Sequence, residues 1–422
     1  MTSLPVCFAH QGNRLLSMRI LHTSDWHLGQ HFIGRSRADE HQAFLRWLVQ
    51  QVQQQQIDAI IVAGDIFDTA TPPSYARELY NQFIVELQHT QCQLVILGGN
   101  HDAAAVLNES KNLLQYLNTH VVASCSDDIT QQLIVLKDKK QQPAVLLCAI
   151  PFIRPRDILQ SQAGQSAQDK QRNLQQAIAG HYQQLFSLAQ QYNTEHKSAL
   201  PIVMTGHLTT LGVSRSESVR DIYIGTLEAF AADAFPAADY IALGHIHQSQ
   251  QINAPGDIRY SGSPIPLSFD EATQQKQAWL ISFIDGEKQV VSLAIPNFQP
   301  MCSIKTNLQQ LQQNVNKALS ALAQDMPLWL ELVIDETDAY LTDLQQRVEQ
   351  LLQDMPVALL RLRRQRSTSQ SILSTEQQTS LSELTPAEVW QARLETEQLT
   401  AEQQTALSRL YHQVLEKLEH SA

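Results

Sequence analysis

Seven residues of metal-ligand type stand at or just beyond the ends of predicted strands. They combine carboxylates, imidazoles and one carboxamide: Asp25, His27, Asp65, Asn100, His207, His245 and His247. A single histidine in such a place is usually a hydrogen-bonded polar residue, but seven such residues together favour a metal centre. Seven ligands exceed the four of one tetrahedral site, so the set predicts two ions. The ligand atoms are nitrogen and oxygen without a thiolate, which suits Mn²⁺, Fe or Zn better than Mg²⁺.

A pair of divalent ions predicts hydrolysis of a phosphoester. Two ions about 3.5–4 Å apart activate a bridging water and stabilise charge on phosphorus. Asp65 stands where a carboxylate could bridge both ions. His101 follows the ligand Asn100, and its imidazolium would stabilise the transition state or protonate the leaving oxygen. Asp102 would orient this imidazole; alternatively, residues 98–102 alone could be a polar turn.

Short apolar strands must position these side chains. The pattern predicts strands over 20–24, 57–63, 92–97, 201–206 and 239–243. Helices are predicted over 38–55 and from Ser74, which would cap the second helix after Pro72 and Pro73. This alternation is typical of a layered α/β domain, in which ligands gather at strand ends. In D-x-H and G-H-x-H, alternate residues of an extended segment would point to the same side.

The pattern continues with further strands and a long helix. Strands are expected over 133–136, 144–150, 279–283 and 290–295, and a helix over 168–192. After a Pro-bounded stretch over 296–300, a small α+β module is predicted over 301–366. Its strands lie near 303–305, 328–334 and 357–362, and its helices over 308–323 and 341–352. A polar linker over 367–385 then leads to a helical segment over 386–420 with an apolar stripe.

Composition limits the classes of protein that fit. The chain has 422 residues, 43% of them hydrophobic, and a formal net charge of −12. This length can bury a sizeable core in two or three domains, and no apolar run approaches the roughly 20 residues of a membrane span. The first strand is entered directly at Met18, and the preceding residues do not resemble a secretory signal. The scattered cysteines (Cys7, Cys92, Cys125, Cys148 and Cys302) form no CxxC, which predicts free thiols and a reducing cytoplasm.

The order of these motifs resembles a known family. D-x-H, G-D-x-x-D, G-N-H-D, G-H and G-H-x-H follow one another as in the calcineurin-like metallophosphoesterases. The flanking words are HTSDWHLG at 22–29, PPSYAR at 72–77, GHLTT at 206–210 and GSPIP at 262–266. They resemble the branch of bacterial nuclease subunits that act in double-strand-break repair, from Met18 nearly to the C-terminus. The resemblance implies a layered β-sandwich flanked by helices for residues 18–295.

The resemblance also implies a set of ligands for each ion and a substrate. One ion would be held by Asp25, His27, Asp65 and His247, and the other by Asp65, Asn100, His207 and His245. The metal would be Mn²⁺ and the substrate DNA, cleaved by 3′-to-5′ exonuclease action on duplexes and by endonuclease action on single strands and hairpins. Such activity would serve repair, recombination and replication of palindromic DNA. Distant members carry a histidine where this chain has Asp68, so a second catalytic histidine is not expected.

Partners follow from the same resemblance. Residues 301–366 would be a capping domain that contacts DNA, and the 386–420 segment would dock the coiled coil of an ATPase subunit. The nuclease subunit would form a homodimer through helices near the active site, giving a heterotetramer in the cytoplasm at the nucleoid. Because the chain is acidic overall, DNA would contact local basic patches, metal ions or a partner. The basic run RLRRQR at 361–366 is one candidate patch, although a solvated strand end is an equal alternative.

Two other functions remain open at this point. A phosphatase or phosphodiesterase acting on small phosphoesters would use the same metal ligands. A non-catalytic scaffold with a vestigial site is a second alternative, which the intact ligand set and His101 argue against. Degradation of linear DNA distinguishes a nuclease from a phosphatase, and a measurement of bound metal distinguishes an enzyme from a scaffold.

Overall fold

The structure is a computed structural model that describes residues 17–158, 166–210, 213–216, 218–219, 229–322, 326–365, 407 and 410. Two compact units are present. The first contains the described residues up to Ser303 together with Ala318–Glu331 and Pro356–Arg361. The second contains Ile304–Lys317, Leu332–Met355 and the described residues from Leu362 onward. The predicted linker over 367–385 and the helical segment over 386–420 lie outside the described residues, apart from Leu407 and Leu410.

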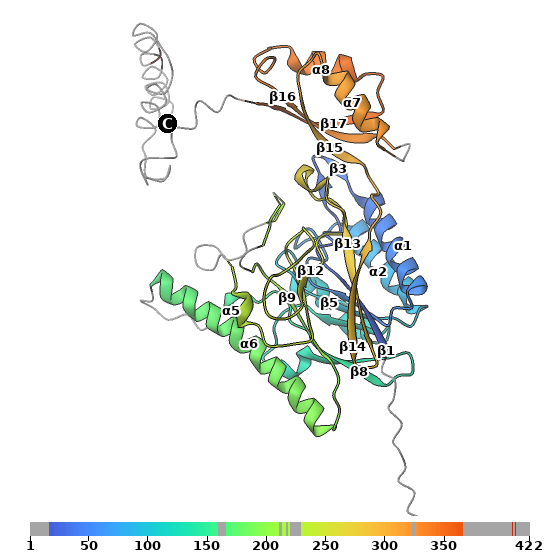
Figure 1. The fold of residues 1–422 in the computed structure, drawn as a ribbon, viewed down its shortest axis with the longest axis vertical. Helices are drawn as coiled ribbons and strands as arrows, with labels where there is room; N and C mark the ends of the chain where they lie inside the picture. The colour runs from blue at the N-terminus through green and yellow to red at the C-terminus, as the bar shows by residue number, and fades with distance from the viewer. Residues whose placement is uncertain are drawn as a thin grey trace, which may run out of the picture. The chain divides into compact units, whose positions relative to one another are not determined.

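Two six-stranded sheets form the centre of the first unit (Figure 1). The first has the order β14 (Glu287–Ala294), β13 (Gln277–Ile284), β1 (Ser17–Thr23), β4 (Ala59–Val62), β5 (Gln93–Leu97) and β6 (Thr119–Val122). The second has the order β11 (Gln250–Gln251), β12 (Ile258–Tyr260), β10 (Tyr240–Gly244), β9 (Ile202–His207), β8 (Pro143–Cys148) and β7 (Leu133–Lys137). Strands β1, β4, β5 and β6 run parallel, as do β8, β9, β10 and β12.

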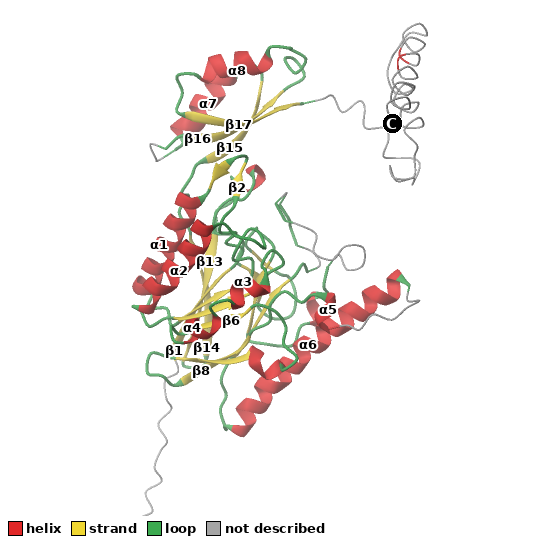
Figure 2. Ribbon diagram, turned by 180° about the vertical axis from the view of Figure 1, so that it is seen from behind, coloured by secondary structure: helices red, strands yellow, loops and turns green. Residues whose placement is uncertain are grey.

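Helices cover the outer face of each sheet (Figure 2). Helices α1 (Ala38–Gln54) and α2 (Ser74–Gln88) pack on the first sheet, and α6 (Ala167–Glu195) packs on the second. Shorter helical elements connect the strands: α3 (Ala104–Asn108), α4 (Lys111–Gln115), α5 (Pro155–Ile158), η1 (Ile129–Gln132), η2 (Ala232–Ala234) and η3 (Phe269–Glu271). A small hairpin joins β2 (His31–Phe32) to β3 (Arg35–Ser36). The predicted sandwich flanked by helices is confirmed.

The alternation of side chains along each strand explains the layers. In β4, Ile60 and Val62 pack in the cluster beneath α1 and α2, whereas Ala59 and Ile61 pack in the cluster between the sheets. Successive residues of a strand point to opposite faces, so a strand that is buried on both faces is apolar throughout. This accounts for the unbroken apolar runs that predict these strands.

A buried histidine connects the two sheets through polar contacts. His22 of β1 places Nδ1 2.9 Å from the Tyr240 hydroxyl and Nε2 3.1 Å from the Leu243 carbonyl oxygen, both in β10. Burial lowers the pKa of His22 to about 3, so its neutral form occupies the core. A neutral imidazole has one donor and one acceptor, and here each has a partner. This contact fixes how the two sheets lie against each other beside the strand ends.

The later part of the chain contains a separate three-stranded sheet of order β15, β16, β17. Its elements are β15 (Met301–Thr306), α7 (Leu311–Ser320), β16 (Leu328–Ile334), α8 (Leu344–Leu352) and β17 (Val357–Arg364). The predicted strand–helix–strand–helix–strand order is confirmed, with both helices starting later than expected. No helix in the described part of the chain has the length and apolar character needed to cross a membrane.

Some local details of the prediction need correction. Ser74 does not cap α2; it is the first helical residue, and Pro73 occupies the capping position. Proline suits this position because its fixed φ leads into the helix while its missing N–H removes one unpaired donor. The cysteines within the described residues, Cys92, Cys125, Cys148 and Cys302, are free thiols as expected.

Candidate metal centre

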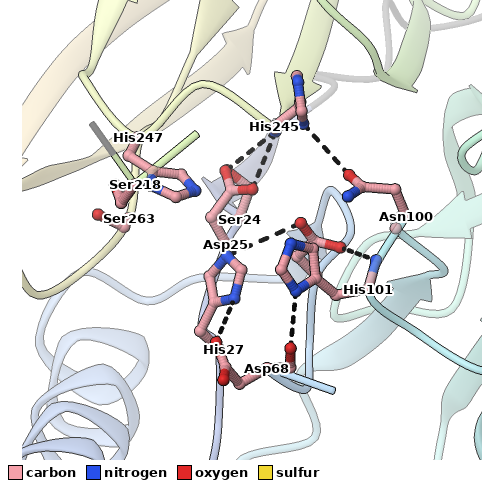
Figure 3. A network of polar contacts seen from close by, with 12 residues as sticks. Ser24, Asp25, His27, Asp68, Asn100, His101, Ser218, His245, His247 and Ser263 are labelled. Carbon is pink, nitrogen blue, oxygen red and sulfur yellow. Dashed lines mark hydrogen bonds and ion pairs between the residues drawn. The ribbon is translucent and has the colours of Figure 1, made fainter. Parts of the chain in front are cut away.

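The expected ligands come from the carboxyl ends of parallel strands in both sheets. Asp25 follows β1, Asp65 follows β4 and Asn100 follows β5, whereas His207 ends β9 and His245 follows β10. Because parallel strands end at the same edge, side chains far apart in the sequence meet there. The six carboxylate and imidazole ligands that the sequence predicts are all buried, and they lie in two groups close to Asn100. Figure 3 shows Asp25, His27, Asn100, His245 and His247 of this set.

These residues form two groups that could each hold a cation. In one, Asp25, His27 and His247 each place a ligand atom within 4.8 Å of the others. In the second, Asp65, His207 and His245 do the same. Asn100 extends the second group, because its Oδ1 lies 2.8 Å from His207 Nε2 and 3.2 Å from His245 Nδ1.

Asp65 lies between the two groups. Its Oδ2 is 3.2 Å from His207 Nε2 and 3.7 Å from His27 Nε2, one imidazole from each group. Its Oδ1 accepts a hydrogen bond of 2.9 Å from the backbone N–H of His101. One carboxylate therefore faces ligands of both predicted ions, as a bridging residue must.

Several histidine rings present one nitrogen to the centre and use the other elsewhere. Nδ1 of His27 lies 3.2 Å from Asp68 Oδ1, and Nδ1 of His207 lies 2.8 Å from the Ala63 carbonyl oxygen. An acceptor at Nδ1 favours the tautomer that keeps a lone pair on Nε2 for a metal ion. His27 Nε2 is buried and has no hydrogen-bond partner among the described residues. These imidazole nitrogens are therefore available as metal ligands. The residues present fit two divalent ions.

The backbone at four of these residues is strained. Asp25, His27, Asp65 and His245 have φ values of 53°, 47°, 51° and 92°, in the left-handed region. The expectations that D-x-H and G-H-x-H lie on extended segments are therefore wrong. Asp25 and His27 still converge, whereas His245 and His247 join different groups of ligands. Such conformations cost about 1–3 kcal/mol each and persist where the surrounding fold enforces them. Here the amide of Asp25 donates to the Gly64 carbonyl and that of His27 to the Asp65 carbonyl.

Glycines permit the close approach of these loops. A Cβ at Gly99 would collide with the Asp65 carboxylate, and one at Gly64 would collide with the His207 ring. Gly64 also has a φ of +94°, which other residues rarely adopt. The glycines of the G-D and G-G-N-H-D motifs thus leave space for the His207 ring and for the Asp65 carboxylate.

Comparisons with known proteins agree with this geometry. Residues 18–249, more than half of the chain, match the family described as calcineurin-like phosphoesterase. Residues 297–398 match the family described as type 5 capsule protein repressor C-terminal domain. The chain is 48% identical over 408 residues to SbcD, a subunit of the nuclease SbcCD, from Escherichia coli K12, covering 96% of this chain and 100% of that protein.

The chain belongs to the SbcD family of nuclease subunits. Family members from Rhodobacter capsulatus and Bacillus subtilis are 34% and 31% identical to it, covering 64% of this chain in each case. The matches cover 67% and 68% of those two proteins.

In this member of the SbcD family, His101 and Asp102 make different contacts from those predicted. His101 Nδ1 lies 2.7 Å from the backbone carbonyl oxygen of Asp68, which orients the ring. The Asp102 carboxylate instead accepts hydrogen bonds from the amides of Gly99, Ile66 and Phe67 at 2.8–3.1 Å. Asp102 therefore ties the loop after β5 to the loop after β4, and the Asp68 carbonyl takes the orienting role expected of Asp102.

Electrostatics show how the buried charges of the centre are balanced. Burial alone would raise the pKa of Asp65, but the positive charge and hydrogen bond of His207 hold it well below its usual range. Burial opposes protonation of His207, yet the Asp65 carboxylate raises the pKa of His207 to about 9. Burial and the charge of Asp65 raise the pKa of Asp102 to about 6. In the metal-free protein His207 is therefore protonated beside Asp65, and a bound cation would take the place of that positive charge.

Three polar residues of the site region were not predicted from the sequence as contacts of the ligands. Ser24 donates to Asp25 Oδ2 and lies 2.7 Å from Ser261 Oγ. Asp68 contacts His27, and Glu271 is fully buried beside His247. The G-D-x-x-D spacing was a signal for Asp68, whereas Glu271 lies in a segment without a metal-ligand pattern.

Substitution of Asp65 tests its position between the ions. In Asp65→Ala, the affinity of the metal-free protein for both Mn²⁺ equivalents should fall at least about tenfold, because one carboxylate faces both groups of ligands. Isothermal titration calorimetry with Mn²⁺ measures both affinities. Asp58→Ala, at a buried aspartate just before β4 that accepts from the Arg19 amide, is the control and should bind two ions normally. Loss of one ion with unchanged affinity for the other would show that Asp65 does not bridge.

Proposed function

We propose that this chain is the catalytic subunit of a DNA nuclease that hydrolyses phosphodiesters at a centre of two Mn²⁺ ions. The convergence of strand-end ligands from both sheets around Asp65 supports this proposal. One ion is assigned to Asp25, His27, Asp65 and His247, and the other to Asp65, Asn100, His207 and His245. The 48% identity to a nuclease subunit over that protein's whole length favours DNA over small phosphoesters.

The chain's own residues have separable roles in this reaction. The ions, when bound, supply positive charge at the phosphorus and lower the pKa of bound water. His101 is assigned as the catalyst that donates a proton to the leaving oxygen. Its Nδ1–H is used by the Asp68 carbonyl oxygen, so Nε2 is the nitrogen that can hold and release the second proton. Asp102 is assigned to positioning, because its contacts hold the loop that carries Asn100 and His101.

Substitution of His101 tests the proposed chemistry. His101→Ala should bind two Mn²⁺ ions nearly as the wild type does, and should lose at least about a hundredfold in cleavage of linear duplex and hairpin DNA. Gel assays of DNA cleavage and metal titration measure the two effects. The exposed His89→Ala is the control and should keep full activity.

Two results would contradict the proposal. Stoichiometric loss of metal from His101→Ala would make His101 a ligand and remove it as the proposed catalyst. A wild-type protein that hydrolyses small phosphomonoesters but leaves linear and hairpin DNA intact with Mn²⁺ would favour the phosphatase alternative.

A homodimer would form through α2 and the residues around α4. Large apolar side chains are exposed there: Val85 on α2 is 54% exposed, Leu113 on α4 65%, and Tyr116 just after α4 84%. A cavity of about 450 Å³ lies between the two regions, lined by Arg77 and Asn81 of α2 and by Leu114 of α4 among others. A second copy of the chain is the occupant that we assign to this region.

The double variant Leu113→Glu/Tyr116→Glu should be a monomer, because charges would be buried in the dimer. Sedimentation equilibrium measures the mass. Tyr340→Glu, at a tyrosine that is 74% exposed in the second unit, is the matched control and should remain a dimer. A double variant with the dimer mass would rule out this surface.

The remaining parts of the chain are assigned to DNA and to a partner. Residues 18–295 are the phosphoesterase domain, and 301–366 are a capping domain that contacts DNA. The basic end of β17 would supply phosphate contacts, although Arg361 already pairs with Glu331 and Arg364 donates to the Ala339 carbonyl. Residues 386–420 would dock the coiled coil of an SbcC-type ATPase subunit. We place the resulting heterotetramer in the cytoplasm, at the nucleoid.

A chain truncated after Arg366 tests the partner segment. It should fold, bind two Mn²⁺ ions and cleave short single strands, because the ligands all precede the removed residues. It should fail to co-purify with the ATPase subunit and lose ATP-stimulated cleavage of duplex ends. Pull-down and cleavage assays measure both. A truncated chain that is insoluble, or that binds the ATPase subunit at full affinity, would contradict this assignment.

A further inference from the structure

Glu271 is a buried carboxylate beside one of the proposed metal ligands. It is 0% exposed and ends the short helix η3. Its Oε1 lies 3.3 Å from His247 Nδ1 and accepts from the hydroxyls of Ser216, at 2.7 Å, and Ser218. An ionised carboxylate at such depth requires several donors or a paired cation to offset the loss of hydration. The donors and the cation that surround Glu271 indicate which neighbouring residue this carboxylate positions.

Lys276 supplies the opposite charge. Its Nζ lies 2.6 Å from Glu271 Oε2 and also donates to the His247 carbonyl oxygen at 3.0 Å. Glu271 Oε2 also accepts from the Leu267 amide at 3.1 Å and from the Ser263 hydroxyl at 3.2 Å, so the charge of Lys276 and several donors surround the carboxylate. The ion pair therefore fixes the backbone of His247 through Lys276 while Glu271 faces its ring.

The hydroxyl of Ser218 decides where the proton of His247 lies. Ser218 Oγ is 2.6 Å from His247 Nδ1 and donates its one proton to Glu271 Oε1. A hydroxyl that donates to a carboxylate has only lone pairs left for the imidazole. Nδ1 must then carry the proton, whether it donates to Ser218 or to Glu271. Nε2 keeps its lone pair, as a metal ligand requires.

We propose that Glu271, through Ser218, is the positioning residue that prepares His247 to bind its metal ion. The proposal deepens the function given above and rests on the two-ion centre. As at His27, a carboxylate lies within hydrogen-bond distance of Nδ1, but at His247 the Ser218 hydroxyl also contacts this nitrogen and donates to the same carboxylate. The proposal also makes Ser216 and Ser218, which lie outside the strand ends, part of the surroundings of the metal centre.

Mn²⁺ binding to the full-length, metal-free protein tests this role. In Glu271→Gln, the affinity for one of the two ions should fall about 10–100-fold, and the affinity for the other should stay unchanged. Ser218→Ala should weaken the same ion, and Ser218→Thr, which keeps the hydroxyl, should restore it. Calorimetric titration gives the two affinities, and electron paramagnetic resonance reports the spin-coupled Mn²⁺ pair, whose signal should appear only at higher Mn²⁺ concentration in the first two variants.

Glu40→Gln is the matched control. Glu40 is also a buried carboxylate in an ion pair, with Arg37, and its substitution should leave both affinities unchanged. Ser218→Ala removes one hydroxyl from a half-buried residue, so it decides the question if Glu271→Gln does not fold.

Three results would contradict either the positioning role of Glu271 or the proposed function. Wild-type affinities in Ser218→Ala and in any folded Glu271→Gln would overturn the positioning role while leaving the two-ion centre intact. An equal loss in Glu40→Gln would also overturn it, because the effect would then be general. A wild-type protein that binds fewer than two Mn²⁺ ions would instead refute the proposed function itself.

Discussion

The metal centre depends on the packing of two sheets against each other. Asp25, Asp65 and Asn100 come from one sheet and His207, His245 and His247 from the other, so neither sheet contains a complete set of ligands. The apolar cluster between the sheets, together with His22 against Tyr240 and Leu243, holds the strand ends in register. Interiors pack as densely as organic crystals, and a shift of one sheet would therefore displace all of that sheet's ligands together.

The packing of the two sheets also brings together the groups that offset the charge of the buried ligand Asp65. Asp65 is 1% exposed and would be costly to ionise alone. His207 and His27 both lie near its Oδ2, and the amide of His101 donates to its Oδ1. The negative charge of Asp65 is thus offset by two imidazoles and one backbone donor. These contacts around Asp65 are all made by groups of the protein.

Much of the fold and of the ligand set could be predicted from the sequence. Strands such as 57–63 were found because they are apolar on both faces, and the ligands were found because each strand ends in a polar motif. The left-handed backbone at Asp25 and His27 could not be predicted, because the enforcing hydrogen bonds come from the loop after β4. The real partner of Asp102 was missed for the same reason, since its amide donors at Ile66 and Phe67 are 35 or more residues away. Glu271 was missed because a single acidic residue carries no spacing signal.

The left-handed backbone at four ligand positions limits how this centre can evolve. Aspartate, asparagine, histidine and glycine tolerate that region, whereas β-branched and bulky residues do not. At Asp25, His27, Asp65 and His245, the residues that can replace the ligand are therefore aspartate, asparagine and histidine, which offer oxygen or nitrogen, and glycine, which offers no side-chain ligand. Adaptation to a different available metal would have to act through residues with ordinary backbone geometry around the ligands. The loop conformations therefore limit which metal ions the centre can be adapted to bind.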